Sequence, residues 1–232
     1  METYTLSLAL EDLVPVIFFG IGLILLARMI GEMHAPARGR ATLGAILITL
    51  GGLTKVVWKI VIAATGTDIN GLDDLLFVFL APGFVLLAWA TGEAQRAGKG
   101  QTLQRTWVFP AVLLGLAGLG AGYTGFTQTG RTWVYILLAT TTIANVWASA
   151  LFIRHARQEG LRLAAGLFFI NILLVFVLSG MGRIPSQTVA LQWVEQIINT
   201  FSTGAFAFAA WKLSGHVRGQ GGVGGEVPLR LK

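Results

Sequence analysis

A layer of polar and ionisable side chains lies near one end of the apolar segments of this sequence, where it could bind a small charged solute. Ionisable groups are costly inside a membrane, so those that lie there are functional candidates by default. A lysine such as Lys55 could bind an anionic group of a solute or act as a titratable partner of Glu195. The candidate ligand-binding residues are Lys55, Lys59, Asp73, Asp74, Glu195, Gln196 and Asn199.

A purely structural explanation competes with this interpretation. Carboxylates at helix N-termini are stabilised by the helix dipole without any ligand. Four residues fit that explanation: Glu11, Asp12, Asp73 and Asp74. Lys59 is close enough to the predicted membrane interface for its ammonium to reach the headgroups. For these five residues the structural explanation is favoured, whereas for Lys55 with Glu195 both alternatives stay open.

Several kinds of chemistry are excluded by the residues that are missing. The sequence contains no cysteine, which excludes disulfides, thiolate metal sites and cysteine nucleophiles. Its three histidines lie outside the apolar segments, so no pair of them could hold a haem between helices and none could join carboxylates around a catalytic metal there. We therefore expect no metal, no cofactor and no catalytic residue, and an enzymatic role is the minority interpretation.

The composition shows which elements must position the polar layer. Of the 232 residues, 54% are hydrophobic and 12% are charged, and a soluble protein has about 25% charged residues. Crossing about 30 Å of hydrocarbon takes about 20 mostly apolar residues. Seven segments qualify, at about 8–30, 41–64, 72–91, 107–124, 132–153, 162–181 and 190–212. The sequence predicts an all-α polytopic membrane protein, with seven transmembrane helices in residues 1–214 and a flexible glycine-rich tail at 215–232.

The distribution of charge predicts how these helices are oriented. Thirteen of the 17 lysines and arginines lie in the connections and the tail on one side of the predicted membrane. Short positively charged loops stay in the cytoplasm, so we expect the N-terminus outside and the C-terminus inside, in a bacterial cytoplasmic membrane. The net charge of +6 follows from this topology. The sequence contains no basic stripe with interleaved aromatic residues, so it does not predict binding of nucleic acid.

The chain also resembles itself at a shift of 122 residues. Residues 72–89 align with residues 194–211, and the alignment matches Asp73 with Glu195. It predicts an internal repeat of two parallel three-helix units that are joined by the fourth helix. Transporters are often built from such repeats, with the binding site between the two units.

This arrangement of three, one and three helices resembles the grouping of SWEET-like sugar transporters and microbial rhodopsins. Glu195, Asn199 and Thr203 have the spacing of the acid, the aspartate and the retinal-bearing lysine in the last helix of a microbial rhodopsin. Thr203 stands in the place of that lysine, and Lys212 is the only lysine of this segment. The resemblance therefore implies the seven-helix architecture without retinal. The chain also lacks the Pro-Gln pair of the sugar transporters.

Two classes of function agree with these features. The first is a transporter or permease for a small solute, with a polar cavity that opens outward. The alternative is a non-transporting protein, either an opsin-like sensor without retinal or an accessory subunit of a larger membrane complex. Besides the lipid bilayer and a small-molecule ligand, a second copy of the chain stays open as a partner, because Gly118 and Gly122 form a GxxxG pair that allows close helix packing.

Overall fold

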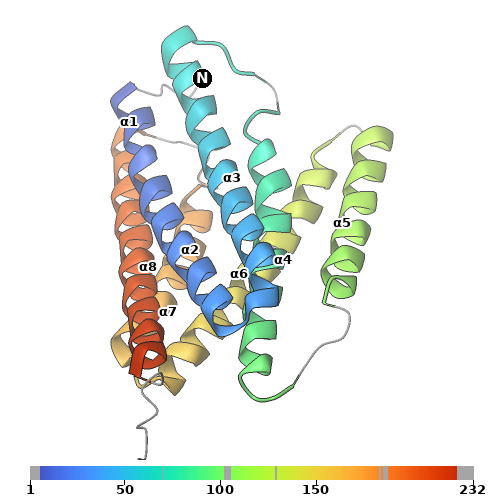
Figure 1. Cartoon of the computed structure of the whole chain (residues 1–232). Coiled ribbons are helices and arrows are strands. Elements are labelled where there is room, and N and C mark those ends of the chain that lie inside the picture. Colours follow the sequence, from blue (N-terminus) through green and yellow to red (C-terminus); the bar gives the residue numbers. More distant parts are fainter. Residues whose placement is uncertain are drawn as a thin grey trace, which may run out of the picture.

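The chain folds into a bundle of long helices, described by a computed structural model (Figure 1). The structure describes residues 6–69, 71–101, 106–128, 130–182, 184 and 188–223. A short helix, α1 (Leu6–Glu11), leads into α2 (Leu13–Met33), and a 3-10 turn, η1 (Ala35–Ala37), leads into α3 (Arg38–Thr65). The other helices are α4 (Leu75–Ala97), α5 (Val108–Thr127), α6 (Thr132–Gln158), α7 (Arg162–Met181) and α8 (Val189–Val223).

The lengths and apolarity of these helices confirm the predicted all-α fold with seven long helices. Six helical segments are long and apolar enough to cross a membrane: Leu6–Met33, Ala35–Thr65, Leu75–Ala97, Val108–Thr127, Thr132–Gln158 and Arg162–Met181. The seventh, α8, is longer, with 35 residues, but is not among these six. It carries a polar side that is buried in the bundle and includes Gln192, Gln196 and Ser202. These are the features of a polytopic membrane protein.

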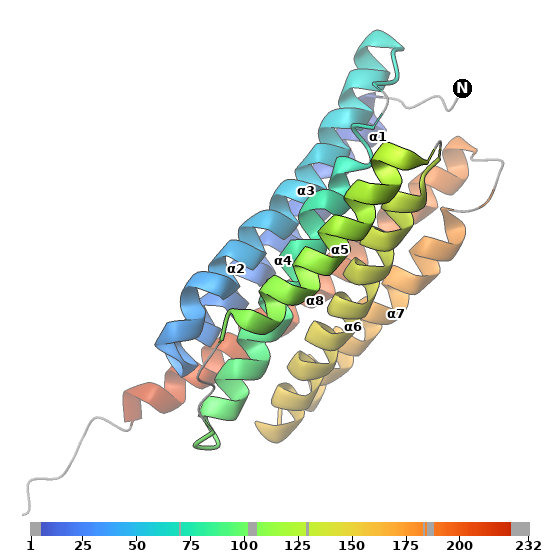
Figure 2. The same cartoon turned by 90° about the vertical axis from the view of Figure 1, so that its right-hand side faces the viewer.

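Six of the long helices form a closed ring, and α5 lies outside it (Figures 1 and 2). Around the ring the order is α2, α3, α4, α6, α7 and α8, and α8 packs back against α2. The three long helices before α5 are therefore neighbours, as are the three after it. The two sets meet where α2 contacts α8 and where α4 contacts α6. We call the end of the bundle where α2 begins the N-terminal end, and the end where α8 finishes the C-terminal end.

The interior of the ring is filled by small residues and aromatic rings. A Cβ atom on Gly44 of α3 would lie 2.7 Å from the carbonyl oxygen of Gly83 in α4, so glycine is required for these helices to approach each other. Further in, Phe206 of α8 packs against Phe19 of α2 and Phe168 of α7, with ring centroids 4.5 Å and 5.5 Å apart. The middle of the bundle is therefore densely packed.

The C-terminal end of α8 differs from the sequence-based boundary. Residues 215–223 were predicted as part of a flexible tail, but α8 continues without a break to Val223. Glycine is a weak helix former, yet each residue added to an existing helix also adds a backbone hydrogen bond. Arg218 also donates to both carboxylate oxygens of Glu32 in α2, at 3.0 and 3.2 Å. The rest of the predicted tail, residues 224–232, lies outside the described residues.

The glycine pair of α5 does not form the close helix contact that its spacing allows. No atom of another residue lies within 4 Å of a Cβ position on Gly118 or Gly122. Both glycines border an apolar groove of about 590 Å³ between α4, α5 and α6, next to Pro82 and Trp133. Because α5 packs mainly on α6, its glycine side faces this groove.

Candidate functional site

Asp12 is the centre of a buried polar cluster at the N-terminal end of the bundle. It lies between α1 and α2 and makes no capping hydrogen bond to the backbone of α2. Its carboxylate instead accepts a hydrogen bond from the Gln196 amide of α8 and pairs with the Lys59 ammonium of α3. All three residues are buried. A buried charge is tolerated when it is paired and hydrogen-bonded, which describes Asp12.

Glu11 extends this cluster along α8. The Thr200 hydroxyl of α8 donates to Oε1 of Glu11 at 2.7 Å. The other carboxylate oxygen, Oε2, is buried and accepts no hydrogen bond from the part of the chain that the structure describes. Together with Asp12, this residue links the start of α2 to α8, which is one of the two places where the two sets of three helices meet.

Gln192 lies one turn before Gln196 on the same side of α8. Its side chain is only 5% exposed, and neither amide atom has a hydrogen-bond partner among the described residues. A buried polar group that is left without a partner costs about 1–3 kcal/mol. A bound water or polar solute would satisfy this amide.

Lys55 lies one turn before Lys59 on α3 and is exposed. Its ammonium is within electrostatic range of carboxylates that come from three other parts of the chain: Asp12, Asp73 and Glu195. Glu195 and Asn199 of α8 are half-buried, and the carbonyl oxygen of Asn199 accepts a hydrogen bond from the Thr203 hydroxyl. Lys55 thus places a second lysine next to the buried cluster.

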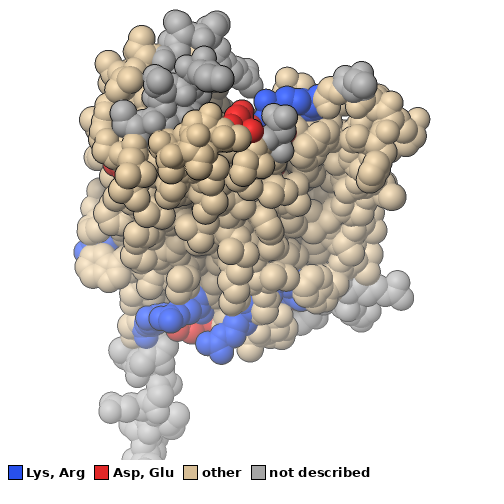
Figure 3. Space-filling model, turned by 90° about the horizontal axis from the view of Figure 1, so that it is seen from above, with Lys and Arg blue, Asp and Glu red and all other residues tan. Residues whose placement is uncertain are grey.

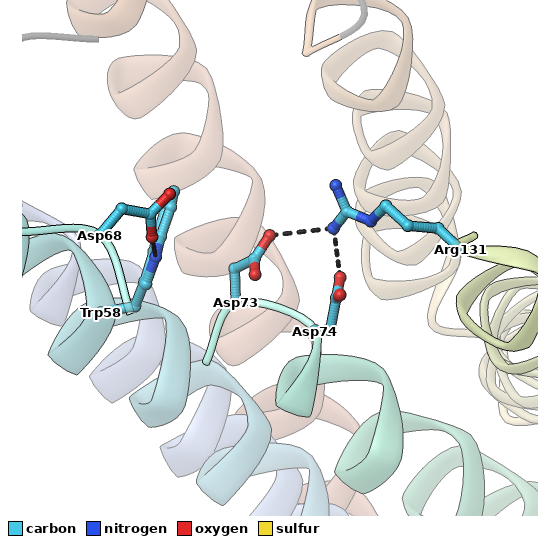
Figure 4. Close-up of polar contacts among 5 residues, drawn as sticks. All are labelled: Trp58, Asp68, Asp73, Asp74 and Arg131. Atoms are coloured by element: carbon cyan, nitrogen blue, oxygen red, sulfur yellow. Dashed lines mark hydrogen bonds and ion pairs between the residues drawn. The ribbon is translucent and has the colours of Figure 1, made fainter. Parts of the chain in front are cut away.

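Asp73 and Asp74 form a separate group at the same end of the bundle (Figure 4). Both precede α4, and both pair with the guanidinium of Arg131, which precedes α6; the distance to Oδ2 of Asp73 is 3.0 Å. The hydrogen bond to Asp74, together with the charges of both carboxylates, raises the pKa of Arg131. This group ties α4 to α6, the second place where the two sets of helices meet.

The charged groups of this end differ in exposure: Asp12 and Lys59 are buried, whereas Lys55 and Arg131 are exposed. Seen from above, an acidic group lies directly beside a basic one, and further basic groups appear at the edge of the view (Figure 3). In the same region the Trp58 indole donates to Asp68 at 2.9 Å (Figure 4).

The burial of Lys59 corrects the structural explanation favoured for it from the sequence. Lys59 was expected to extend to lipid headgroups, but it is only 9% exposed and pairs with Asp12. Asp12 does lie at the N-terminus of α2, and its carboxylate also contacts Lys59 of α3 and Gln196 of α8. These partners come from helices distant in the sequence, so the spacing of residues did not show them.

A second buried ion pair, which the sequence analysis did not identify, lies at the C-terminal end. The guanidinium of Arg40 in α3 pairs with the Glu93 carboxylate in α4, and each residue is 3% exposed. His34 Nε2 lies 3.3 Å from Oε1 of Glu93, and the Trp107 ring centroid lies 5.3 Å from Cζ of Arg40. One feature of the sequence could have indicated this pair. Glu93 is an acid that directly follows the apolar segment 72–91, on the side of the predicted membrane where most lysines and arginines lie.

The N-terminal cluster contains buried groups that could bind a polar molecule. Within the described ranges, no three histidine, cysteine, aspartate or glutamate residues are close enough to hold a metal ion. The Gln192 amide and the Oε2 atom of Glu11 are buried at this end and have no hydrogen-bond partner among the described residues. The residues present therefore suit the binding of a small polar molecule.

The chain was also compared with known proteins. No family model matches it, and no curated protein or solved structure is similar to it.

Proposed function

We propose that this chain is a transporter or permease that handles a small polar solute at the cluster around Asp12. The observation that carries the proposal is the buried amide of Gln192, which has no hydrogen-bond partner in the described chain although it lies one turn from Gln196. A solute that reaches this amide would remove its desolvation cost. Binding would therefore be favoured most for molecules that both donate and accept hydrogen bonds.

The nearby charges define the class of solute. The ammonium of Lys55 suits an anionic group, such as a carboxylate. Oε2 of Glu11 suits a hydrogen-bond donor, such as an ammonium or a hydroxyl. A small molecule that carries both, for example a zwitterion, matches these groups better than a neutral sugar does.

The position of the cluster supports transport. Asp12 and Gln196 meet at the contact between α2 and α8, and Arg131 bridges the contact between α4 and α6. Both contacts join the first three long helices to the last three. In transporters built from repeats, substrates bind between the repeated units, and relative movement of the units exposes the site alternately to each side. The position of α5 outside the ring suits a helix that only connects two such units.

The predicted orientation would place this cluster on the external side. The positive charges of the opposite end favour the cytoplasm for the connections there. A solute would then enter from outside, at the end of the bundle that carries Lys55.

A second candidate function is solute sensing without transport. The observation that favours it is the aromatic packing in the middle of the ring, where Phe19, Phe168 and Phe206 fill the path between the two ends. A sensor needs the external site but no path through the bundle. The two candidates differ in whether the bound solute crosses the membrane.

Binding is tested by thermal unfolding of the purified chain in detergent, with glycine, succinate and glucose as zwitterionic, anionic and neutral probes. We expect glycine or succinate to raise the melting temperature and glucose to leave it unchanged. The rise should be lost in Gln192→Leu and in Lys55→Gln. It should persist in the control Arg131→Gln, which changes an exposed charge at the same end. Equal stabilisation in all variants, or none in the wild-type chain, would contradict the proposal.

Transport is tested with the probe that stabilises the chain. Counterflow of that probe into proteoliposomes, absent in Gln192→Leu, would support the transporter. Binding without counterflow would instead favour the sensor.

A further inference from the structure

A groove lies at the C-terminal end of the bundle, between the end of α6 and the start of α7. Its volume is about 440 Å³, within the range of about 300–1,000 Å³ that is usual for ligand sites. The residues that line it are Arg157, Arg162, Ala165, Gly166 and Phe169. The groove therefore combines two cationic side chains with a short apolar surface.

The side chains of the two arginines have no partner among the described residues. Both residues are exposed, and neither guanidinium makes an ion pair or hydrogen bond there. The turn between the helices, with Gly160 at a φ of 74°, brings them to the same groove. The acid in this turn, Glu159, lies beside α8 instead, with its Oε2 atom 3.5 Å from Nε2 of His216.

The apolar part of the groove follows one side of α7. Residues 162, 165, 166 and 169 are spaced by three or four positions, so they lie in a continuous stripe along the helix. Above Gly166, no atom lies within 4 Å of the position that a Cβ would occupy. Phe169 lies further along the helix, toward the middle of the bundle, and is 57% exposed. An extended hydrocarbon chain could lie along this stripe below the arginines.

We propose that this groove binds an anionic phospholipid, with the phosphate between Arg157 and Arg162 and an acyl chain along α7. A guanidinium offers paired N–H donors that match a phosphate, and two of them without counter-charges form a strong phosphate site. Basic pockets between transmembrane helices are known to hold the headgroups of anionic lipids. The apolar stripe that continues from Arg162 to Phe169 is the reason to infer a lipid rather than free phosphate. The site is independent of the solute site at the opposite end.

The headgroup contact is tested by native mass spectrometry of the purified full chain in detergent. The probes are phosphatidylglycerol, phosphatidylcholine and inorganic phosphate. We expect the wild-type chain to bind phosphatidylglycerol more tightly than phosphatidylcholine. The double variant Arg157→Gln/Arg162→Gln should bind phosphatidylglycerol about tenfold or more weakly, because two charge-assisted contacts are lost. The matched control is Arg154→Gln, which removes an exposed arginine of α6 that does not line the groove.

The acyl-chain contact is tested by Gly166→Leu, which fills the stripe and keeps both arginines. Leucine is a better helix former than glycine, so the variant should fold, which its melting temperature will show. We expect it to lose phosphatidylglycerol and to retain inorganic phosphate. Unchanged lipid binding in Gly166→Leu would identify a phosphate site and overturn the lipid proposal. Unchanged lipid binding in the double arginine variant, or an equal loss in Arg154→Gln, would overturn it as well.

Discussion

Arg40 and Lys59 lie at opposite ends of α3, and each is buried against a carboxylate from another part of the chain. They are nineteen residues apart, which at about 1.5 Å per residue is about 28 Å along the helix axis. That distance is close to the thickness of the hydrocarbon layer, about 30 Å. The two ion pairs thus hold both ends of α3 to its neighbours, and Lys55 is the one charged residue of the helix between them.

Removing one partner of the Lys59–Asp12 pair should strongly destabilise the chain. Asp12→Asn and Lys59→Met each remove one partner of this buried ion pair, which costs about 3–5 kcal/mol in comparable cases. The double variant Asp12→Asn/Lys59→Met removes both charges and should unfold at a higher temperature than either single variant. The measurement is thermal unfolding in detergent. Strictly additive effects of the two substitutions would show that the residues do not act as a pair.

At the C-terminal end, Glu93 should matter far more than His34. Glu93→Gln leaves the buried guanidinium of Arg40 uncompensated and should cost about 3–5 kcal/mol. His34 is a quarter exposed at its side chain, and an exposed ionic contact contributes about 1 kcal/mol or less. His34→Ala should therefore lower the melting temperature only slightly. Similar losses in the two variants would mean that Arg40 is not held mainly by Glu93.

The helices could be predicted from the sequence because their signal is local. A segment that crosses a membrane must satisfy its backbone hydrogen bonds internally, so a long apolar run is enough to indicate a helix. The order of the helices around the ring is not local. The position of α5 outside the ring depends on how well its surface packs against each of the other six helices. The spacing of residues within 108–127 does not contain this information.

The sequence predicted some residues of the site but not their partners, because only the residues give a local signal. Lys55, Lys59 and Gln196 were identified because polar residues in apolar segments are conspicuous. Their partners depend on the register between helices: Gln196 and Asp12 are 184 residues apart in the chain. The pairing of Asp73 and Asp74 with Arg131, and of Glu93 with Arg40, required the same three-dimensional information.

The contact between Arg131 and the two aspartates should add little stability and should depend on salt. Its guanidinium side chain is 59% exposed, and exposed ion pairs are worth about 1 kcal/mol or less. Because folding raises the pKa of Arg131, its contribution is fully present below the unfolded pKa and is lost only in strong alkali. Arg131→Gln should therefore lower the melting temperature by a small amount that is constant around neutral pH. A loss that does not shrink at about 1 M salt would contradict a screened surface contact.

The close approach of α3 and α4 gives a prediction with an internal control. Gly44→Ala places a Cβ atom 2.7 Å from the carbonyl oxygen of Gly83, so the two backbones must separate. Overpacking of this kind costs about 1–3 kcal/mol. Gly118→Ala adds the same atom on α5, where no atom lies within 4 Å, and should be neutral or slightly stabilising. Equal melting temperatures of the two variants would show that α3 and α4 are further apart.

Gln192 should show opposite effects on stability and on solute binding. In the free protein its buried amide lacks a partner, so replacing it with leucine removes a desolvation cost of about 1–3 kcal/mol and should raise the melting temperature. The same substitution removes both hydrogen-bonding atoms offered to a solute and should abolish stabilisation by glycine or succinate. If Gln192 served only for packing, its substitution would lower the melting temperature of the free chain, and any loss of solute binding would follow from that lower stability. Thermal unfolding with and without the probe measures both effects in one experiment. If Gln192→Leu melts below the wild-type chain, the amide has a partner that stabilises the free protein and is not reserved for a ligand.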